Sequence, residues 1–148
     1  MKNFASAILF FCILSFSFSG CGPRSVTSSL GNPTPIQKPQ SGKATVTGKV
    51  ISTISNEPLA ESVWLAAVTR QGDQGAYVLN ATSSPSIYAD ENGVFVLANV
   101  DPREYVIIVG NPEGQNVVIP DSSGKPKVWD IKADQVFDTG ELKVKLSK

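Results

Sequence analysis

The sequence predicts an all-β domain, a single β-sandwich of seven or eight short strands over residues 44–148. Two observations predict it. Of these 105 residues, 22 are Val or Ile, whose β-branched side chains favour strands. Turn-forming residues recur every eight to twelve positions, and no window has the apolar spacing of a long amphipathic helix. Many short strands between regular turns are typical of a sandwich.

The first expected strand, residues 44–51, alternates small or apolar side chains with Thr and Lys, which puts the two kinds on opposite faces. The second, residues 63–69, is apolar on both faces, which indicates a central position or a partly covered outer face. The later expected strands are residues 77–81, 87–89, 94–98, 105–109, 117–119, 128–131, 136–137 and 141–146. Between them lie clusters of Gly, Pro, Asn, Asp and Ser, the residues that favour turns.

Four residues of this domain are expected to hold the fold together. In the turn at residues 90–93, Asp90 should accept backbone hydrogen bonds, and Gly93 can adopt a positive φ. Phe95 and Tyr105 begin runs of inward-facing apolar side chains on their strands, so both should lie in the core between the sheets.

The first 20 residues have the pattern of a secretory signal. Lys2 precedes an uncharged, mostly apolar run of about 14 residues, too short to span a bilayer as a helix. Residues 18–21, Phe-Ser-Gly-Cys, resemble the lipobox of bacterial lipoproteins, although Phe18 stands where that family prefers an aliphatic residue. This resemblance implies cleavage before Cys21 and acylation of Cys21 with long chains such as palmitate, which would anchor the protein in a membrane. The alternative is an ordinary signal peptide that leaves a free thiol.

Residues 21–43 are expected to form a disordered tether between the anchor and the domain. Residues 22–43 contain four prolines, three glycines and four serines, and too few large apolar side chains to offset the entropy of ordering. Their three basic side chains could attract anionic lipid headgroups, although a solvated spacer explains them as well.

Composition narrows the chemistry of the domain. The chain has no His, and after cleavage and acylation the domain would have no thiol, so common catalytic triads and His or Cys metal sites are excluded. The turn at residues 90–92 lacks the spacing of a helix–loop–helix calcium site. Nine basic and 13 acidic side chains give residues 44–148 a net charge of −4, which argues against nucleic acid as a partner. We therefore expect no cofactor, no metal and no catalysis.

Several short motifs of the domain occur in the order of a known family. They are Gly48-Lys49-Val50, Glu57-Pro58-Leu59-Ala60, Ala89-Asp90-Glu91-Asn92-Gly93-Val94-Phe95, Asn99-Val100-Asp101-Pro102 and Tyr105-Val106-Ile107. In this order they resemble the carboxypeptidase regulatory-like domain. The resemblance implies a transthyretin-like (prealbumin-like) sandwich of seven strands with no catalytic activity of its own.

These observations predict a lipid-anchored, extracytoplasmic binding or structural module of the cell envelope. The leading hypothesis is docking to another envelope protein through a sheet face or edge. The alternative is polysaccharide binding through an exposed aromatic ring, with Trp64 and Trp129 as candidates beside Tyr77 and Tyr88. A small hydrolase is the least favoured. Gly22, which follows the anchor, favours the outer membrane in a Gram-negative cell; otherwise the outer face of the cytoplasmic membrane is expected.

Overall fold

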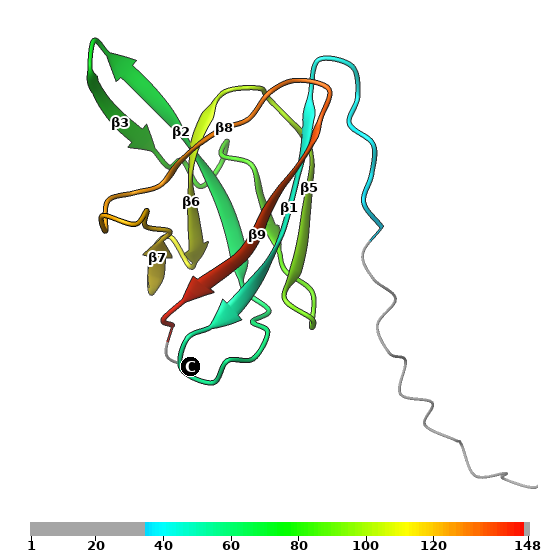
Figure 1. Ribbon diagram of the computed structural model, residues 1–148, viewed down its shortest axis with the longest axis vertical. Coiled ribbons are helices and arrows are strands. Elements are labelled where there is room, and N and C mark those ends of the chain that lie inside the picture. Colours follow the sequence, from blue (N-terminus) through cyan, green and yellow to red (C-terminus); the bar gives the residue numbers. More distant parts are fainter. Residues whose placement is uncertain (1–34, 147–148) are drawn as a thin grey trace, which may run out of the picture.

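A computed structural model describes residues 35–146, and in this range every regular element is a strand (Figure 1). The all-β prediction is therefore confirmed. The strands are β1 (Ala44–Ser52), β2 (Ser62–Gln71), β3 (Gln74–Val78), β4 (Ser86–Tyr88), β5 (Val94–Val100), β6 (Glu104–Gly110), β7 (Asn116–Val118), β8 (Val128–Asp130) and β9 (Val136–Val144). Within the described range no helix could cross a membrane. The expected signal peptide, Cys21 and most of the expected tether lie outside it.

The strands form two sheets. In the smaller sheet β1 is central, antiparallel to β5 and parallel to β9. In the larger sheet β2 and β6 are the central, antiparallel pair. Each of them has two short partners along its other side: β3 and β4 pair with β2, and β7 and β8 pair with β6.

One apolar core lies between the two sheets, which gives a sandwich-like arrangement. β6 supplies alternate residues to it, including Ile107 and Val109, and the smaller sheet supplies residues such as Val46 and Val50. Phe95 and Tyr105 also lie in this core, and they are only 1% and 3% exposed. The Tyr105 hydroxyl donates to the Asp101 carbonyl oxygen at 3.1 Å, and burial raises the pKa of that hydroxyl.

The described strands number nine, where the sequence predicted seven or eight. The last two expected strands are one continuous strand, β9, because an extra residue relative to β1 is accommodated near Gly140, which has a φ of +71°. β3 begins three residues earlier than expected. The turn before it uses only Gly72 and Asp73, so Gln71 pairs with Gln74.

The turn between β4 and β5 packs tightly against β1. Asp90 Oδ1 accepts hydrogen bonds from the backbone N–H groups of Asn92 and Val94, each at 2.9 Å. Gly93 has a φ of +74°, and a methyl group there would overlap the carbonyl oxygen of Val50. Glycine is therefore required at this position for its conformation and for the close approach.

The segment before β1 is bonded to the domain, although its composition predicted disorder through Lys43. The Gln37 carbonyl accepts a hydrogen bond from Thr45 Oγ1 at 2.8 Å, and the Lys43 ammonium pairs with Asp101 at 2.5 Å. Two residues with left-handed backbones add further bonds. Asn99 Oδ1 accepts from the N–H of Gln40, and Asp134 Oδ1 accepts from the N–H of Gly42. We call residues 37–43 the strap.

Candidate functional site

The structure places Trp129 inside the protein. Its side chain is 8% exposed, and the edge-on ring of Phe137 lies 5.9 Å from it. The Lys127 ammonium covers the ring at 3.6 Å from the centroid. The indole N–H has no hydrogen-bond acceptor among the described residues. A ligand-contact residue needs an open ring face for a sugar, and Trp129 has none.

Trp64 lies on the outer face of the larger sheet but is half-buried. Its ring packs against a second apolar cluster that includes Ala66, Val106 and Ile108. Its indole N–H donates to the Gly110 carbonyl oxygen at 3.1 Å. These contacts tie Trp64 to β6, so its role in the structure is to cover the outer face of the sheet.

A groove lies on the same outer face, between the β2–β3 hairpin and the loop that connects β7 to β8. Its volume is about 270 Å³. The apolar residues lining it include Val68, Val106 and Val128, from three neighbouring strands. The other lining residues are Arg70, Gly75, Ala76, Tyr77, Lys125 and Pro126. A larger hollow beside β5, of about 460 Å³, has no charged side chain among its described lining residues.

The β2–β3 hairpin forms one wall of the groove. β2 continues past its last pair with β6, so the hairpin projects from the sandwich (Figure 1). In the hairpin Val68 pairs with Tyr77 and Arg70 pairs with Gly75, which puts all four on the same face. Tyr77 is 40% exposed. Because Gly75 has no side chain, the space beside the Arg70 guanidinium stays open: a methyl there would make only ordinary contacts, 3.6 Å from Val68 and 3.7 Å from Arg70 Nη1.

Glu104 on β6 holds the Arg70 guanidinium by a two-pronged contact. Arg70 Nε donates to Glu104 Oε2 at 2.5 Å and Nη2 donates to Oε1 at 2.9 Å, which leaves Nη1 on the Gly75 side. The hydrogen bond from Arg70 lowers the pKa of the Glu104 carboxyl, and the same pair raises the pKa of Arg70. The geometry is that of a fork matched to a carboxylate, which fixes the orientation of the guanidinium.

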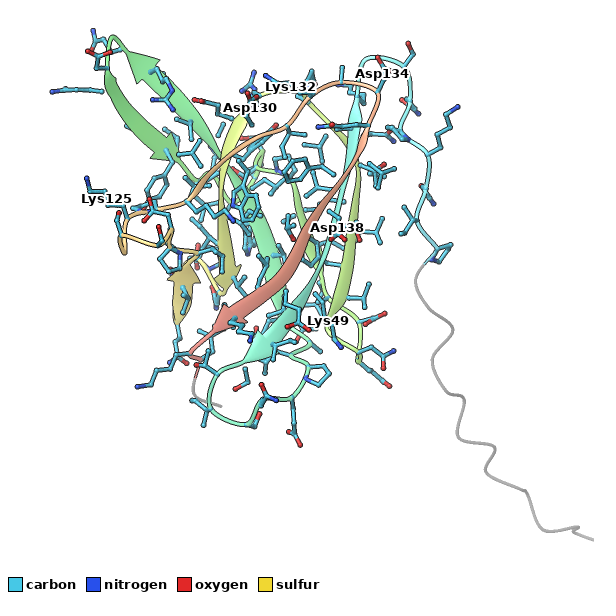
Figure 2. All side chains as sticks on the ribbon, in the orientation of Figure 1. Lys49, Lys125, Asp130, Lys132, Asp134 and Asp138 are labelled. Carbon is cyan, nitrogen blue, oxygen red and sulfur yellow. The ribbon has the colours of Figure 1, made fainter. Side chains whose placement is uncertain are left out.

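Beside Arg70 and Glu104, two more charged residues lie at the rim of the sheet, and together the four form a row of charges. Asp130 stands opposite Glu104 in the register, and Lys132 pairs with Asp130 at 2.5 Å. Figure 2 shows Asp130, the last residue of β8, close to Lys132. Because Arg70 and Lys132 flank the two carboxylates, the row is balanced and adds no net negative charge beside the groove.

Lys125 stands on the opposite wall, in the loop that follows β7. A tight turn fixes its backbone: Asp121 Oδ1 accepts from the N–H groups of Ser123 at 2.8 Å and of Lys125 at 3.1 Å. The Asp121 N–H donates to the Lys125 carbonyl at 2.7 Å. Hydrogen bonds from Ser123 lower the pKa of the Asp121 carboxyl. The Lys125 side chain is solvent-exposed and extends from the loop (Figure 2), with no ion pair to any described acid.

The two tryptophans that the sequence indicates as ligand contacts are used for packing. Of the residues that line the groove, Tyr77 is one of the four aromatic candidates, whereas no motif in the sequence points to Arg70 or Lys125. Among residues 35–146, no group of three or more Cys, Asp or Glu side chains could hold a metal ion.

Neither the family models nor the curated proteins contain a match to this chain. Solved structures with some likeness include a 9R-lipoxygenase from Cyanothece (19% identity, 75% of this chain, 18% of that one, TM-score 0.39). Another is the major pilin subunit of Bacillus cereus (16% identity, 72% of this chain, 30% of that one, TM-score 0.41). A third is a proposed carbohydrate-binding protein from Pseudomonas aeruginosa (16% identity, 72% of this chain, 92% of that one, TM-score 0.44). The chain spans less than a third of the first two, and at TM-scores below 0.5 none of the three carries an argument about function.

Proposed function

We propose that this protein is a lipid-anchored, extracytoplasmic, non-catalytic binding module of the cell envelope, and that it binds a saccharide in the groove beside Tyr77. In this proposal the domain is a transthyretin-like sandwich of the carboxypeptidase regulatory-like type, and Cys21 carries the lipid. In a Gram-negative cell the anchor would lie in the outer membrane.

One observation carries the saccharide assignment: a half-exposed aromatic ring stands beside an apolar floor and two hydrogen-bonding side chains. Sugars present an apolar ring face together with hydroxyl groups, so they are bound where an aromatic ring and polar groups converge. Tyr77 supplies the ring, and Arg70 and Lys125 supply the donors. The groove, at about 270 Å³, lies just below the range of about 300–1,000 Å³ that is typical of small-molecule sites.

Binding of the full-length protein in detergent to a panel of envelope and plant glycans tests this proposal. Tyr77→Ala should weaken binding by about tenfold or more, because it removes the aromatic contact. Tyr88→Ala is the matched control, since Tyr88 is 64% exposed on β4, outside the groove. Equal losses in both variants, or no glycan bound by the wild-type protein, would contradict the proposal.

Docking to another envelope protein remains a second candidate because of the outer edge of β3 and β4. Large apolar side chains are exposed on both strands, with Val78 at 58% and Tyr88 at 64%. No described strand pairs with this side of β3 or β4. Exposed apolar side chains on an unpaired edge favour protein contacts.

A photo-crosslinking residue at position 88, in intact cells, tests that second function. It should give one discrete adduct that the same residue at position 145, on the opposite sheet, does not give. Val78→Asp should abolish the adduct, since a charge would be placed on the apolar edge. An adduct that persists in Val78→Asp, or appears equally from position 145, argues against docking at this edge.

A further inference from the structure

We infer that the groove is selective for acidic sugars: the hexuronic acid units of a polysaccharide, with the carboxylate held between Arg70 and Lys125 and the sugar ring against Tyr77. This inference rests on the proposed saccharide function and specifies the ligand class of the same site.

The groove differs in charge from the rest of the domain. Residues 44–148 carry a net charge of −4, yet the described residues lining the groove include two cations and no acid. The nearest carboxylates, Glu104 and Asp130, are paired with Arg70 and Lys132. The Arg70–Glu104 pair is neutral as a whole, so Lys125 is the lining cation that forms no ion pair with a described acid, and it favours an anionic ligand over a neutral or cationic one.

The hydrogen-bond donors Arg70 and Lys125 reach the groove from opposite walls. Glu104 occupies Nε and Nη2 of Arg70, and Nη1 remains on the groove side next to Gly75. Lys125 is positioned from the opposite wall by the turn around Asp121. A guanidinium that is fixed before the ligand arrives loses little side-chain entropy on binding. A carboxylate that enters the groove would meet one fixed donor group and one flexible ammonium.

The apolar part of the groove suits the ring of a sugar. Val68, Val106 and Val128 line the groove with apolar surface, and Tyr77 stands on the hairpin wall. A free inorganic anion would gain nothing from this apolar surface, whereas a sugar ring would bury one of its faces there. A sugar ring that carries a carboxylate uses both the apolar and the cationic part of the lining, and a hexuronic acid is such a ring.

The test compares tetragalacturonate with the neutral cellotetraose by calorimetry, with full-length protein in detergent at low salt. Inorganic phosphate serves as a ring-free anion. We expect tetragalacturonate to bind roughly tenfold more tightly than cellotetraose, the change typical of one charge-assisted hydrogen bond. Its affinity should fall as salt is raised from about 0.02 to 0.2 M, because the contact is partly exposed.

Two variants separate charge from space. Lys125→Gln keeps a hydrogen-bond donor but removes the charge, so it should reduce the affinity for tetragalacturonate by roughly fivefold to tenfold and that for cellotetraose by a clearly smaller factor. Gly75→Val keeps every charge but fills the groove beside Arg70, and it should abolish binding of both sugars. Because β-branched residues suit a strand and a methyl at Gly75 meets no close atom, this variant should fold, which its thermal unfolding will show.

Equal affinity for the two tetrasaccharides, with both lost in Gly75→Val, overturns the acidic selectivity and leaves the saccharide site intact. Binding of phosphate as tight as that of tetragalacturonate overturns the role of the ring. If no sugar binds, or if Gly75→Val binds as well as the wild type, both the inference and the proposed function fail.

Discussion

Replacement of Gly93 by alanine should strongly destabilise this domain. Gly93 has a φ of +74°, which costs an alanine about 1–2 kcal/mol. The added methyl would also overlap the Val50 carbonyl oxygen and lie 3.2 Å from the backbone nitrogen of Leu59. Both atoms are backbone, and they hydrogen-bond to each other at 3.0 Å, so neither can move without loss.

Overpacking of this kind typically costs a further 1–3 kcal/mol, which gives a total of about 2–5 kcal/mol. The control is Gly124→Ala: its φ of +82° carries the same conformational cost, but a methyl there meets nothing within 4 Å. Urea unfolding of both variants measures the two effects separately, and the difference in unfolding free energy should be at least about 1 kcal/mol. Equal losses in the two variants would refute the close approach of the turn to β1.

The other predictions concern the core, the ion pair and the anchor. Phe95→Ala should lower the unfolding free energy by about 3–5 kcal/mol, because Phe95 is 1% exposed. Tyr88→Ala, on the surface, should lower it by less than about 0.5 kcal/mol, and similar values for both variants would place Phe95 outside the core. Arg70 lowers the pKa of Glu104, so the ionised carboxylate stabilises the fold above the ordinary glutamate pKa of 4.5, and this stabilisation is lost as pH falls through the lowered value. The thermal midpoints of wild type and Glu104→Gln should therefore differ at pH 7 and converge below pH 4.5; a gap that widens in acid contradicts the sign. Mass spectrometry of protein from cell membranes should find an N-terminus at Cys21 with a diacylglycerol, absent in Cys21→Ser; an unmodified N-terminus at another residue would end the lipoprotein interpretation.

The strands that the sequence located best are those with a strong pattern over many residues. β1 matches its expected range to within one residue because apolar and polar side chains alternate along it. β6 is apolar from Tyr105 to Val109 and bounded by turns, so its range was also well defined. The continuity of β9 could not be predicted, because Asp138, Thr139 and Gly140 look like a turn. Only the partner strand shows that one extra residue is absorbed there as a bulge.

The candidate site was less accessible to sequence reasoning than the fold, for a physical reason. Arg70 and Lys125 are far apart in the chain, and they meet across the groove because β2 pairs with β6, which in turn pairs with β8. No local pattern contains that order of strands. The tryptophans drew attention by their size, but large aromatic rings are also what a small domain uses to cover a sheet, as Trp64 does. Gly75 gave no signal in the sequence, because it lies among the turn-forming residues before the expected strand at residues 77–81, and only the structure places it in β3.

The strap fixes the side of the domain on which the N-terminal chain enters. Figure 1 shows the chain before β1 running beside β5, on the side of the domain away from β3 and from the loop that carries Lys125. Two left-handed residues, Asn99 and Asp134, hold this segment through their side-chain oxygens. A left-handed backbone is tolerated by Asn and Asp but is still unfavourable, so the bonds to the strap offset a real cost. The strap therefore fixes the point of entry of the chain on the β5 side, and a lipid on Cys21 would be joined to the domain on the side away from the groove.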